Sequence, residues 1–213
     1  MENEANVAAL GELGAWAEAD PTAERASFLY ISGEIGVGAG IVLDGRLFRG
    51  ARGFGGELGH VTIRPDGPPC RCGARGCLEA YANQEALVQR AGLGQPGPTG
   101  AVDQLVALAA AGVPDALAAV EEAGTALGVA AAAVVNLIDV DTVVLGGIYA
   151  PLSAWLCGPV QREIGDRVLT AQWAPVAVRP SMLGASATVV GAAGSVVRTI
   201  RDAPAFWLTT ATS

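Results

Sequence analysis

The sequence carries little positive charge. Of its 213 residues, 13 are Lys or Arg and 21 are Asp or Glu, so the formal net charge is -8. Nonspecific binding to DNA needs clustered basic side chains that displace counterions from the phosphates. The composition therefore excludes DNA binding by this chain alone.

Long apolar runs and a basic start are also missing. We see no apolar run of the roughly 20 residues that a membrane span needs, and the acidic start MENEAN differs from the basic start of a signal peptide. Hydrophobic residues make up 51% and charged residues only 16% of the chain, a balance typical of a closely packed globular domain. We therefore expect a cytoplasmic protein that has no membrane partner.

Cysteine is scarce but clustered. Three of the 4 cysteines, Cys70, Cys72 and Cys77, fall within one short stretch, and His60, the only histidine, precedes them. Without an export signal, disulfides are not expected. One imidazole and three thiolates are a complete tetrahedral ligand set for a structural zinc, with no open position for an activated water. The alternative is a set of free thiols and a loop histidine.

Apolar patterns divide the chain into strands and helices. Residues 2–17 show helical spacing, whereas residues 27–32 and 38–43 have strand length and are followed by the turn Asp44-Gly45 into residues 46–48. This order predicts an antiparallel meander. Residues 50–76 show no regular period, so we expect a bound metal to hold this segment in place.

The second half alternates between helix and strand. We expect helices over residues 102–111, 114–136, 151–169 and 188–200 and strands over 141–147 and 176–179. The glycines Gly124 and Gly128 lie one turn apart, a spacing that lets a helix approach its neighbour closely. The alternation predicts an α/β layered sheet with a binding crevice outside the strand ends, where Gly146 and Gly147 sit.

One long motif resembles a known family. The run Gly56-Glu57-Leu58-Gly59-His60, followed by Cys70-x-Cys72-Gly73-x-x-Gly76-Cys77-Leu78-Glu79, closely resembles the signature of the ROK family of bacterial sugar kinases and sugar-responsive repressors. Residues 2–6, 36–41, 145–147 and 184–193 also agree with the family pattern, so the resemblance covers nearly the whole chain. It implies the actin-like ATPase or sugar kinase fold, which is ribonuclease H-like. Residues 1–213 would form mainly its second lobe, the C-terminal part of a sugar-binding domain with a zinc loop over residues 56–79.

The resemblance also implies a ligand set. Sugar hydroxyls would be held by Asn3, Glu57, His60 and Glu79, because carboxylates accept hydrogen bonds while amide and imidazole groups donate them. Glu57 and Glu79 alone would be taken for ordinary surface carboxylates, but both stand beside the expected metal ligands. If one ring nitrogen of His60 binds the metal, the other is left to donate to a sugar hydroxyl.

The chain departs from the family's kinases at two places. Glu4 stands where the kinases have the aspartate that acts as general base, so it is a degenerate catalytic position. Glu34 and Ile35 replace a Thr-Gly pair that contacts nucleotide phosphates, and a carboxylate there repels phosphate. The glycines that resemble the family's nucleotide loops are retained as a remnant: Gly36, Gly38, Gly146 and Gly147.

These features favour a sugar-binding effector domain of a ROK transcriptional regulator with a structural zinc, closest in motif pattern to the non-kinase members. The alternative is a glucokinase-like enzyme that uses ATP and Mg²⁺ to phosphorylate a hexose. A third reading is a scaffold that only dimerises through its Ala-rich helix. The resemblance suggests a homodimer, and DNA contact only through a segment outside this chain, since the family's first lobe and winged helix-turn-helix have no counterpart here.

Overall fold

One mixed sheet organises the protein. The computed structural model describes residues 3–94 and 100–204, and its strands follow the order β3-β2-β1-β4-β5. They span Phe28–Gly33 (β1), Val37–Leu43 (β2), Arg46–Leu47 (β3), Thr142–Gly147 (β4) and Ala177–Pro180 (β5). Strands β1 to β3 pair antiparallel, whereas β4 lies parallel to β1 and β5 parallel to β4. The predicted meander and the α/β alternation are confirmed.

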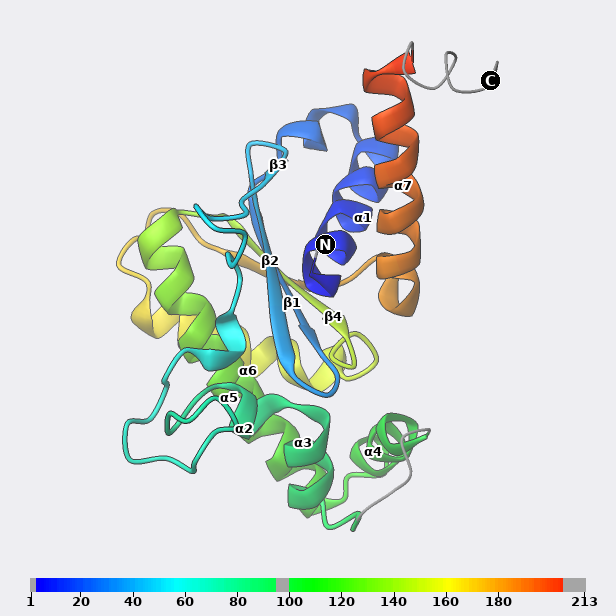
Figure 1. Cartoon of the computed structure of the whole chain (residues 1–213). Helices are drawn as coiled ribbons and strands as arrows, with labels where there is room; N and C mark the ends of the chain where they lie inside the picture. The colour runs from blue at the N-terminus through cyan, green and yellow to red at the C-terminus, as the bar shows by residue number, and fades with distance from the viewer. Residues whose placement is uncertain (1–2, 95–99, 205–213) are drawn as a thin grey trace.

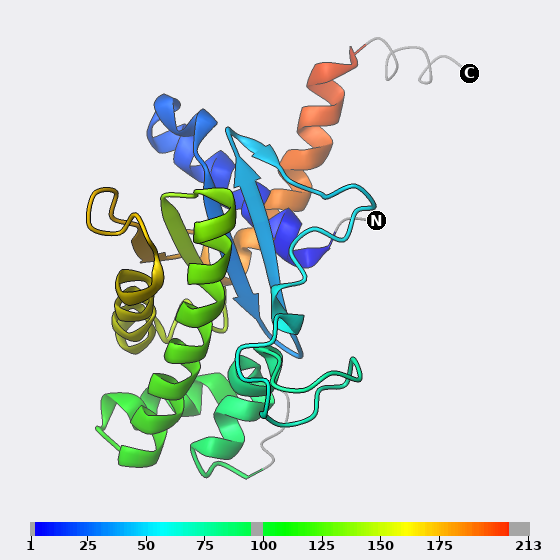
Figure 2. The same ribbon diagram turned by 90° about the vertical axis from the view of Figure 1, so that its left-hand side faces the viewer.

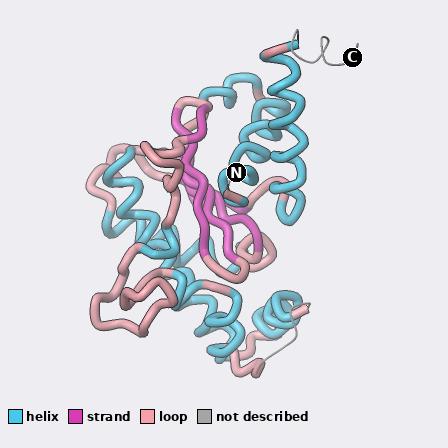
Figure 3. The backbone as a smooth tube through the Cα atoms, viewed as in Figure 1, coloured by secondary structure: helices cyan, strands magenta, loops and turns pink. Residues whose placement is uncertain are grey.

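Helices cover both faces of this sheet (Figures 1 and 3). The helices α1 (Glu4–Ala19) and α7 (Ala187–Asp202) cover one face, and α5 (Pro114–Ile138) and α6 (Ser153–Arg167) cover the other. Along β1, Phe28 and Tyr30 join the core beneath α1, whereas Leu29 and Ile31 join the larger core beneath α5. This alternation follows from the two-residue period of a strand and produces three layers.

Small residues allow the helices to pack closely. A Cβ added to Gly124 of α5 would lie 2.7 Å from the Cβ of Pro159 in α6, and one on Gly128 would lie 2.6 Å from the Cβ of Glu163. On the other face, Gly11 of α1 meets the backbone of Ala187 in α7 in the same way. The predicted role of the α5 glycines is confirmed.

Helix α5 corrects one expectation. With 25 residues and a mean hydropathy of 1.5 in its most apolar window, it is long and apolar enough to cross a membrane. The expectation that no segment reaches this length is therefore wrong, because the many alanines of α5 raise its hydropathy. Of that window, 61% is buried inside the protein, as is typical of a core helix, and Figure 2 shows α5 running along the sheet.

The remaining elements are short. The helices α2 (Glu79–Ala82) and α3 (Gln84–Arg90) were not predicted, whereas α4 (Ala101–Ala110) was. Within residues 3–94 and 100–204, the 3-10 turns are η1 (Pro21–Arg25), η2 (Leu58–His60) and η3 (Gly184–Ser186). Glu2, which we expected at the start of the first helix, lies outside the described residues. Residues 50–76 form the long loop of Figure 3, which contains η2 and the isolated bridge residues Thr62, Pro69 and Arg75, as their lack of period predicts.

Candidate functional site

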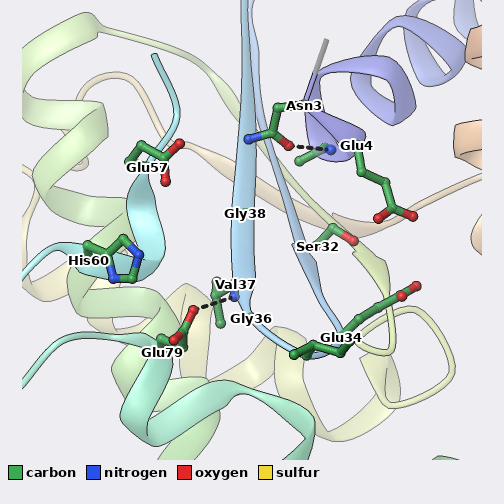
Figure 4. A pocket seen from close by; sticks show the side chains of 12 residues that line it. Asn3, Glu4, Ser32, Glu34, Gly36, Val37, Gly38, Glu57, His60 and Glu79 are labelled. Carbon is green, nitrogen blue, oxygen red and sulfur yellow. Dashed lines mark hydrogen bonds between the residues drawn. The ribbon is translucent and has the colours of Figure 1, made fainter. Parts of the chain in front are cut away.

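A cleft opens where β1 turns into β2. Its volume is about 260 Å³, and it lies between the start of α1, the β1–β2 turn and the loop that carries η2 (Figure 4). The lining residues are Asn3, Glu4, Ala5, Ser32, Glu34, Ile35, Gly36, Val37, Gly38, Glu57, His60 and Glu79. The structure thus brings together Asn3, Glu57, His60 and Glu79, which are separated in the sequence.

Asn3 caps helix α1 and faces the cleft. Its backbone is extended, and its Oδ1 accepts a hydrogen bond from the N–H of Ala5 at 2.9 Å. An asparagine in this position satisfies one of the free N–H groups at the start of a helix. Because the oxygen is used by the cap, the amide nitrogen is left as a donor, and in Figure 4 it points toward the side where Glu57 lies.

Glu79 is held against the start of β2. It is the first residue of α2, and its Oε2 accepts from the N–H of Val37 at 3.4 Å (Figure 4). A Cβ on Gly36 would lie only 2.7 Å from that oxygen. The absence of a Cβ at Gly36 therefore makes room for the Glu79 carboxylate, and a larger residue there would make this flexible side chain move.

The loop that carries Glu57 and His60 packs on strand β2. The N–H of Ala39 donates to the carbonyl of Gly56 at 3.0 Å, and Gly56 has a φ of +97°, which disfavours any other residue. A Cβ there would lie 2.0 Å from the carbonyl oxygen of Ala39. This close approach places Glu57 and His60 over strand β2, and both side chains are exposed to solvent.

His60 and the three nearby cysteines converge on one point. The ligand atoms of His60, Cys70, Cys72 and Cys77 all lie within 4.8 Å of one another. The His60 Nδ1 is 3.8 Å from the Cys70 Sγ, and the Cys72 and Cys77 sulfurs are also 3.8 Å apart. Zinc–sulfur bonds of about 2.3 Å in a tetrahedron give sulfur–sulfur distances of about 3.8 Å. The four residues therefore fit a closed tetrahedral metal site.

The cysteines differ in their surroundings. Cys77 is fully buried, and burial raises the pKa of its thiol to about 12, whereas a hydrogen bond from the backbone of Ala74 lowers the pKa of the exposed Cys72. Without a cation the buried thiol would thus stay protonated at neutral pH. A coordinated cation reverses this preference, since thiols deprotonate when they bind a metal.

His60 belongs to both sites. Its Nδ1 lies on the side of the cysteines, while the ring lines the cleft. The remaining nitrogen, Nε2, is then available to a molecule in the cleft as an N–H donor, because a metal on Nδ1 fixes the tautomer.

The end of the cleft away from His60 is acidic. Glu4, in the first turn of α1, and Glu34, after β1, lie on either side of Ser32 in Figure 4. Partial burial, and then the charge of Glu4, raise the pKa of Glu34. The two carboxylates therefore lie close enough to repel each other.

The four glycines of the expected nucleotide remnant are divided between two places. Gly36 and Gly38 line the cleft, whereas Gly146 and Gly147 end β4 and pair with β1 outside this lining. A Cβ on Gly146 would lie 1.9 Å from the hydroxyl of Tyr30, and Gly147 has a φ of +52°. Packing and backbone conformation explain both glycines of β4.

Two buried polar side chains, of which Tyr149 contacts the helix that carries Glu79, were missed by the sequence analysis. Glu12 is fully buried in α1 and accepts hydrogen bonds from the N–H groups of Met182 and Leu183 at 3.1 and 3.0 Å. Tyr149 donates to the carbonyl of Ala82 at 2.8 Å and so ties the end of β4 to the helix that Glu79 begins. In the sequence, the only indication of a buried role for Glu12 is that it is a charged residue in a mostly apolar predicted helix.

The sheet order, the helices on both faces and the cleft at the β1–β2 turn define a domain of the actin-like ATPase and sugar kinase fold. The chain belongs to the ROK family, whose model matches residues 1–198.

Relatives include both regulators and kinases. The xylose repressor of Bacillus subtilis (strain 168) is 31% identical over 199 residues, which are 92% of this chain and 50% of the repressor. The crystal structure of a ROK hexokinase from Thermus thermophilus is 37% identical, with a TM-score of 0.72 over 94% of this chain and 65% of that one. A ROK glucokinase from Streptomyces griseus, solved with glucose and AMPPNP, is 29% identical, with a TM-score of 0.75 over 91% of this chain and 66% of that one. The chain thus spans about half the length of the repressor.

Proposed function

We propose that this chain is the sugar-binding effector part of a ROK transcriptional regulator and does not transfer phosphate. It would form mainly the second lobe of the sugar-binding domain. In the cleft, the carboxylates of Glu57 and Glu79 accept hydrogen bonds from sugar hydroxyls, while the Asn3 amide and the His60 ring donate to sugar oxygens.

The observation that carries this proposal is the carboxylate of Glu34 at one end of the cleft, where the family's kinases have a Thr-Gly pair. By the resemblance to the kinases, Glu34 would lie where they contact the phosphates of ATP, and Glu4 where they hold the general base. Phosphoryl transfer depends on groups that neutralise the developing charge on the phosphate oxygens. The carboxylate of Glu34 opposes that charge.

We propose zinc as the metal of the His60 and cysteine cluster. Three sulfurs and one nitrogen suit zinc better than a hard cation such as Mg²⁺ or Ca²⁺. A bound zinc supplies structural cross-linking here and no open coordination position. Its ligands lie next to two cleft residues, since His60 itself lines the cleft and Cys77 precedes Glu79 by two positions, so the metal loop fixes the shape of this side.

The partners of such a regulator would be a sugar effector, a second copy of the chain and DNA. A net charge of -8 disfavours contact between this chain and DNA phosphates, so a segment outside it would make that contact. The homodimer and a cytoplasmic location belong to the same proposal.

The second candidate is a hexose kinase that uses ATP and Mg²⁺. It is favoured by the identity to the Thermus thermophilus hexokinase and by the carboxylate of Glu4, which lines the cleft at the start of α1. Glutamate is one methylene longer than aspartate, and a displacement of about 1 Å can lower a rate by about a hundredfold. If the chain is a kinase, we therefore expect it to phosphorylate a hexose slowly.

A single pair of measurements separates the two candidates. The zinc-loaded chain is titrated calorimetrically with D-xylose, D-glucose and D-mannose, and ADP release is followed with the same sugars, ATP and Mg²⁺. We expect saturable binding of at least one sugar and no ADP release above background. Sugar-dependent turnover that disappears in Glu4→Gln would establish the kinase and overturn the proposal.

A further inference from the structure

We propose that the cleft selects its sugar by charge, with Glu34 as a specificity-determining residue. It accepts an uncharged or amine-bearing monosaccharide and rejects sugars that carry a phosphate or a carboxylate. The inference rests on the proposed sugar-binding function and adds the chemical class of the ligand.

Apart from His60, the titratable side chains among the described residues that line the cleft are all acidic. Four carboxylates line it, those of Glu4, Glu34, Glu57 and Glu79. The sequence contains no lysine, and no arginine is among the cleft-lining residues in the described part of the chain. An anionic sugar would therefore meet like charges and find no cation to pair with, which disfavours its binding.

The start of helix α1 is the one feature that would attract an anion. A helix N-terminus carries about half a positive charge. In α1 that end already has the carboxylate of Glu4 in its first turn, and the side-chain oxygen of Asn3 occupies the N–H of Ala5. Against this half charge stand the four carboxylates of the described lining, so the start of α1 does not make the cleft attractive to an anion.

The position of Glu34 makes it the discriminating side chain. It lies with Glu4 at the end of the cleft opposite His60, and both side chains are exposed, so an added substituent of the sugar can reach them (Figure 4). The raised pKa of Glu34 agrees with the crowding of negative charge at this end. An ammonium group there would make charge-assisted hydrogen bonds, whereas a phosphate offers mainly acceptor oxygens to acceptor oxygens.

The test is a competition among derivatives of one sugar. The neutral hexose that binds best among D-glucose, D-mannose and D-galactose is compared calorimetrically with its 6-phosphate, its uronate and its 2-amino derivative at fixed pH and ionic strength. An opposite charge within about 4–6 Å shifts the pKa of a carboxyl group by about 1–3 units, which is roughly 10- to 1000-fold in an equilibrium constant, and a like charge acts in the opposite direction. We therefore expect the two anions to bind at least about tenfold more weakly than the neutral hexose, and the amino sugar at least as tightly.

Two variants with the same change in net charge distinguish the effect of the Glu34 charge in the cleft from the effect of the net charge of the whole chain. Glu34→Gln should reduce the ratio of the Kd of the 6-phosphate to the Kd of the hexose at least threefold. Glu18→Gln, at an exposed position farther along α1, should leave this ratio unchanged. Binding of the 6-phosphate or the uronate as tightly as the hexose would overturn the inference, as would equal effects of the two variants. If neither D-xylose nor any hexose, charged or neutral, binds to the folded and metal-loaded chain, the proposed function itself fails and the inference fails with it.

Discussion

Coupling between the metal cluster and the cleft can be measured through Cys72 and Glu79. Cys72 is an exposed ligand of the cluster and does not line the cleft, so Cys72→Ser removes one thiolate without a change to the core. Cys77, in contrast, is fully buried, and its replacement would also disturb packing. Glu79→Gln removes the charge of a cleft side chain and leaves its shape.

The structure sets the expected size of each loss. Glu79 would make a charged hydrogen bond to the sugar, worth about 1.5–3 kcal/mol, which corresponds to about 10- to 150-fold in Kd. Cys72 supports the loop that presents His60 and Glu79, and loss of such support typically costs about 10- to 100-fold. Both variants should therefore weaken sugar binding by similar factors. Because they act on one group of residues, the double variant should lose less than the sum of the two free-energy changes.

Calorimetric titration of the four proteins in this cycle, with zinc content measured for each, is the assay. Cys157→Ser is the matched control, since this half-buried thiol lies on α6 outside the cluster and its replacement should leave both zinc and sugar binding unchanged. If Cys72→Ser loses the zinc and keeps full sugar affinity, the metal only ties down a remote loop and the coupling does not exist.

Three further outcomes are expected. Metal analysis should find about one zinc per chain, and its removal should increase hydrogen exchange in residues 56–79; zinc-free protein with unchanged exchange there would contradict the structural role. Gly36→Ala should weaken sugar binding about tenfold or more, because its Cβ would displace the Glu79 carboxylate, whereas Gly14→Ala, which meets no atom within 4 Å, should not; equal affinities in calorimetry would refute this. Burial and the charge of Glu4 raise the pKa of Glu34 in the folded protein above its ordinary value of about 4.3. The protein therefore loses free energy of unfolding as the pH rises between these two values, because the folded state must then ionise a carboxyl group that it holds protonated. Glu34→Gln should therefore raise the Tm at pH 7 and lose this advantage near pH 4, and a difference independent of pH in thermal unfolding would contradict the assignment.

The candidate metal-binding cluster could be predicted from the sequence because its chemistry is local. Thiolates and one imidazole at short spacing in a segment without regular structure leave few other functions, and the cluster of His60, Cys70, Cys72 and Cys77 converges as expected. Strands β1 and β4 could also be predicted from the sequence, since both are apolar runs that end at glycines. The core helix α5 was placed correctly, although its hydropathy was underestimated.

Other features depend on contacts between distant parts of the chain. Glu12 reaches partners 170 and 171 residues away, Met182 and Leu183, so no local pattern reveals its role. Gly36 resembles part of a phosphate loop in sequence, yet in the structure it makes room for Glu79, 43 positions further on. The helices α2 and α3 were missed because they are short and follow the metal loop directly.

Direct binding of a neutral sugar in the cleft is the central claim, and one calorimetric titration tests it. The zinc-loaded chain and its Glu57→Gln variant are titrated with D-xylose, D-glucose and D-mannose. The structure predicts one-site binding of at least one of these sugars, weakened about tenfold or more in the variant, because Glu57 lines the cleft as an acceptor. Folded, metal-loaded protein that binds none of them, or that binds equally well without the Glu57 charge, would contradict the account.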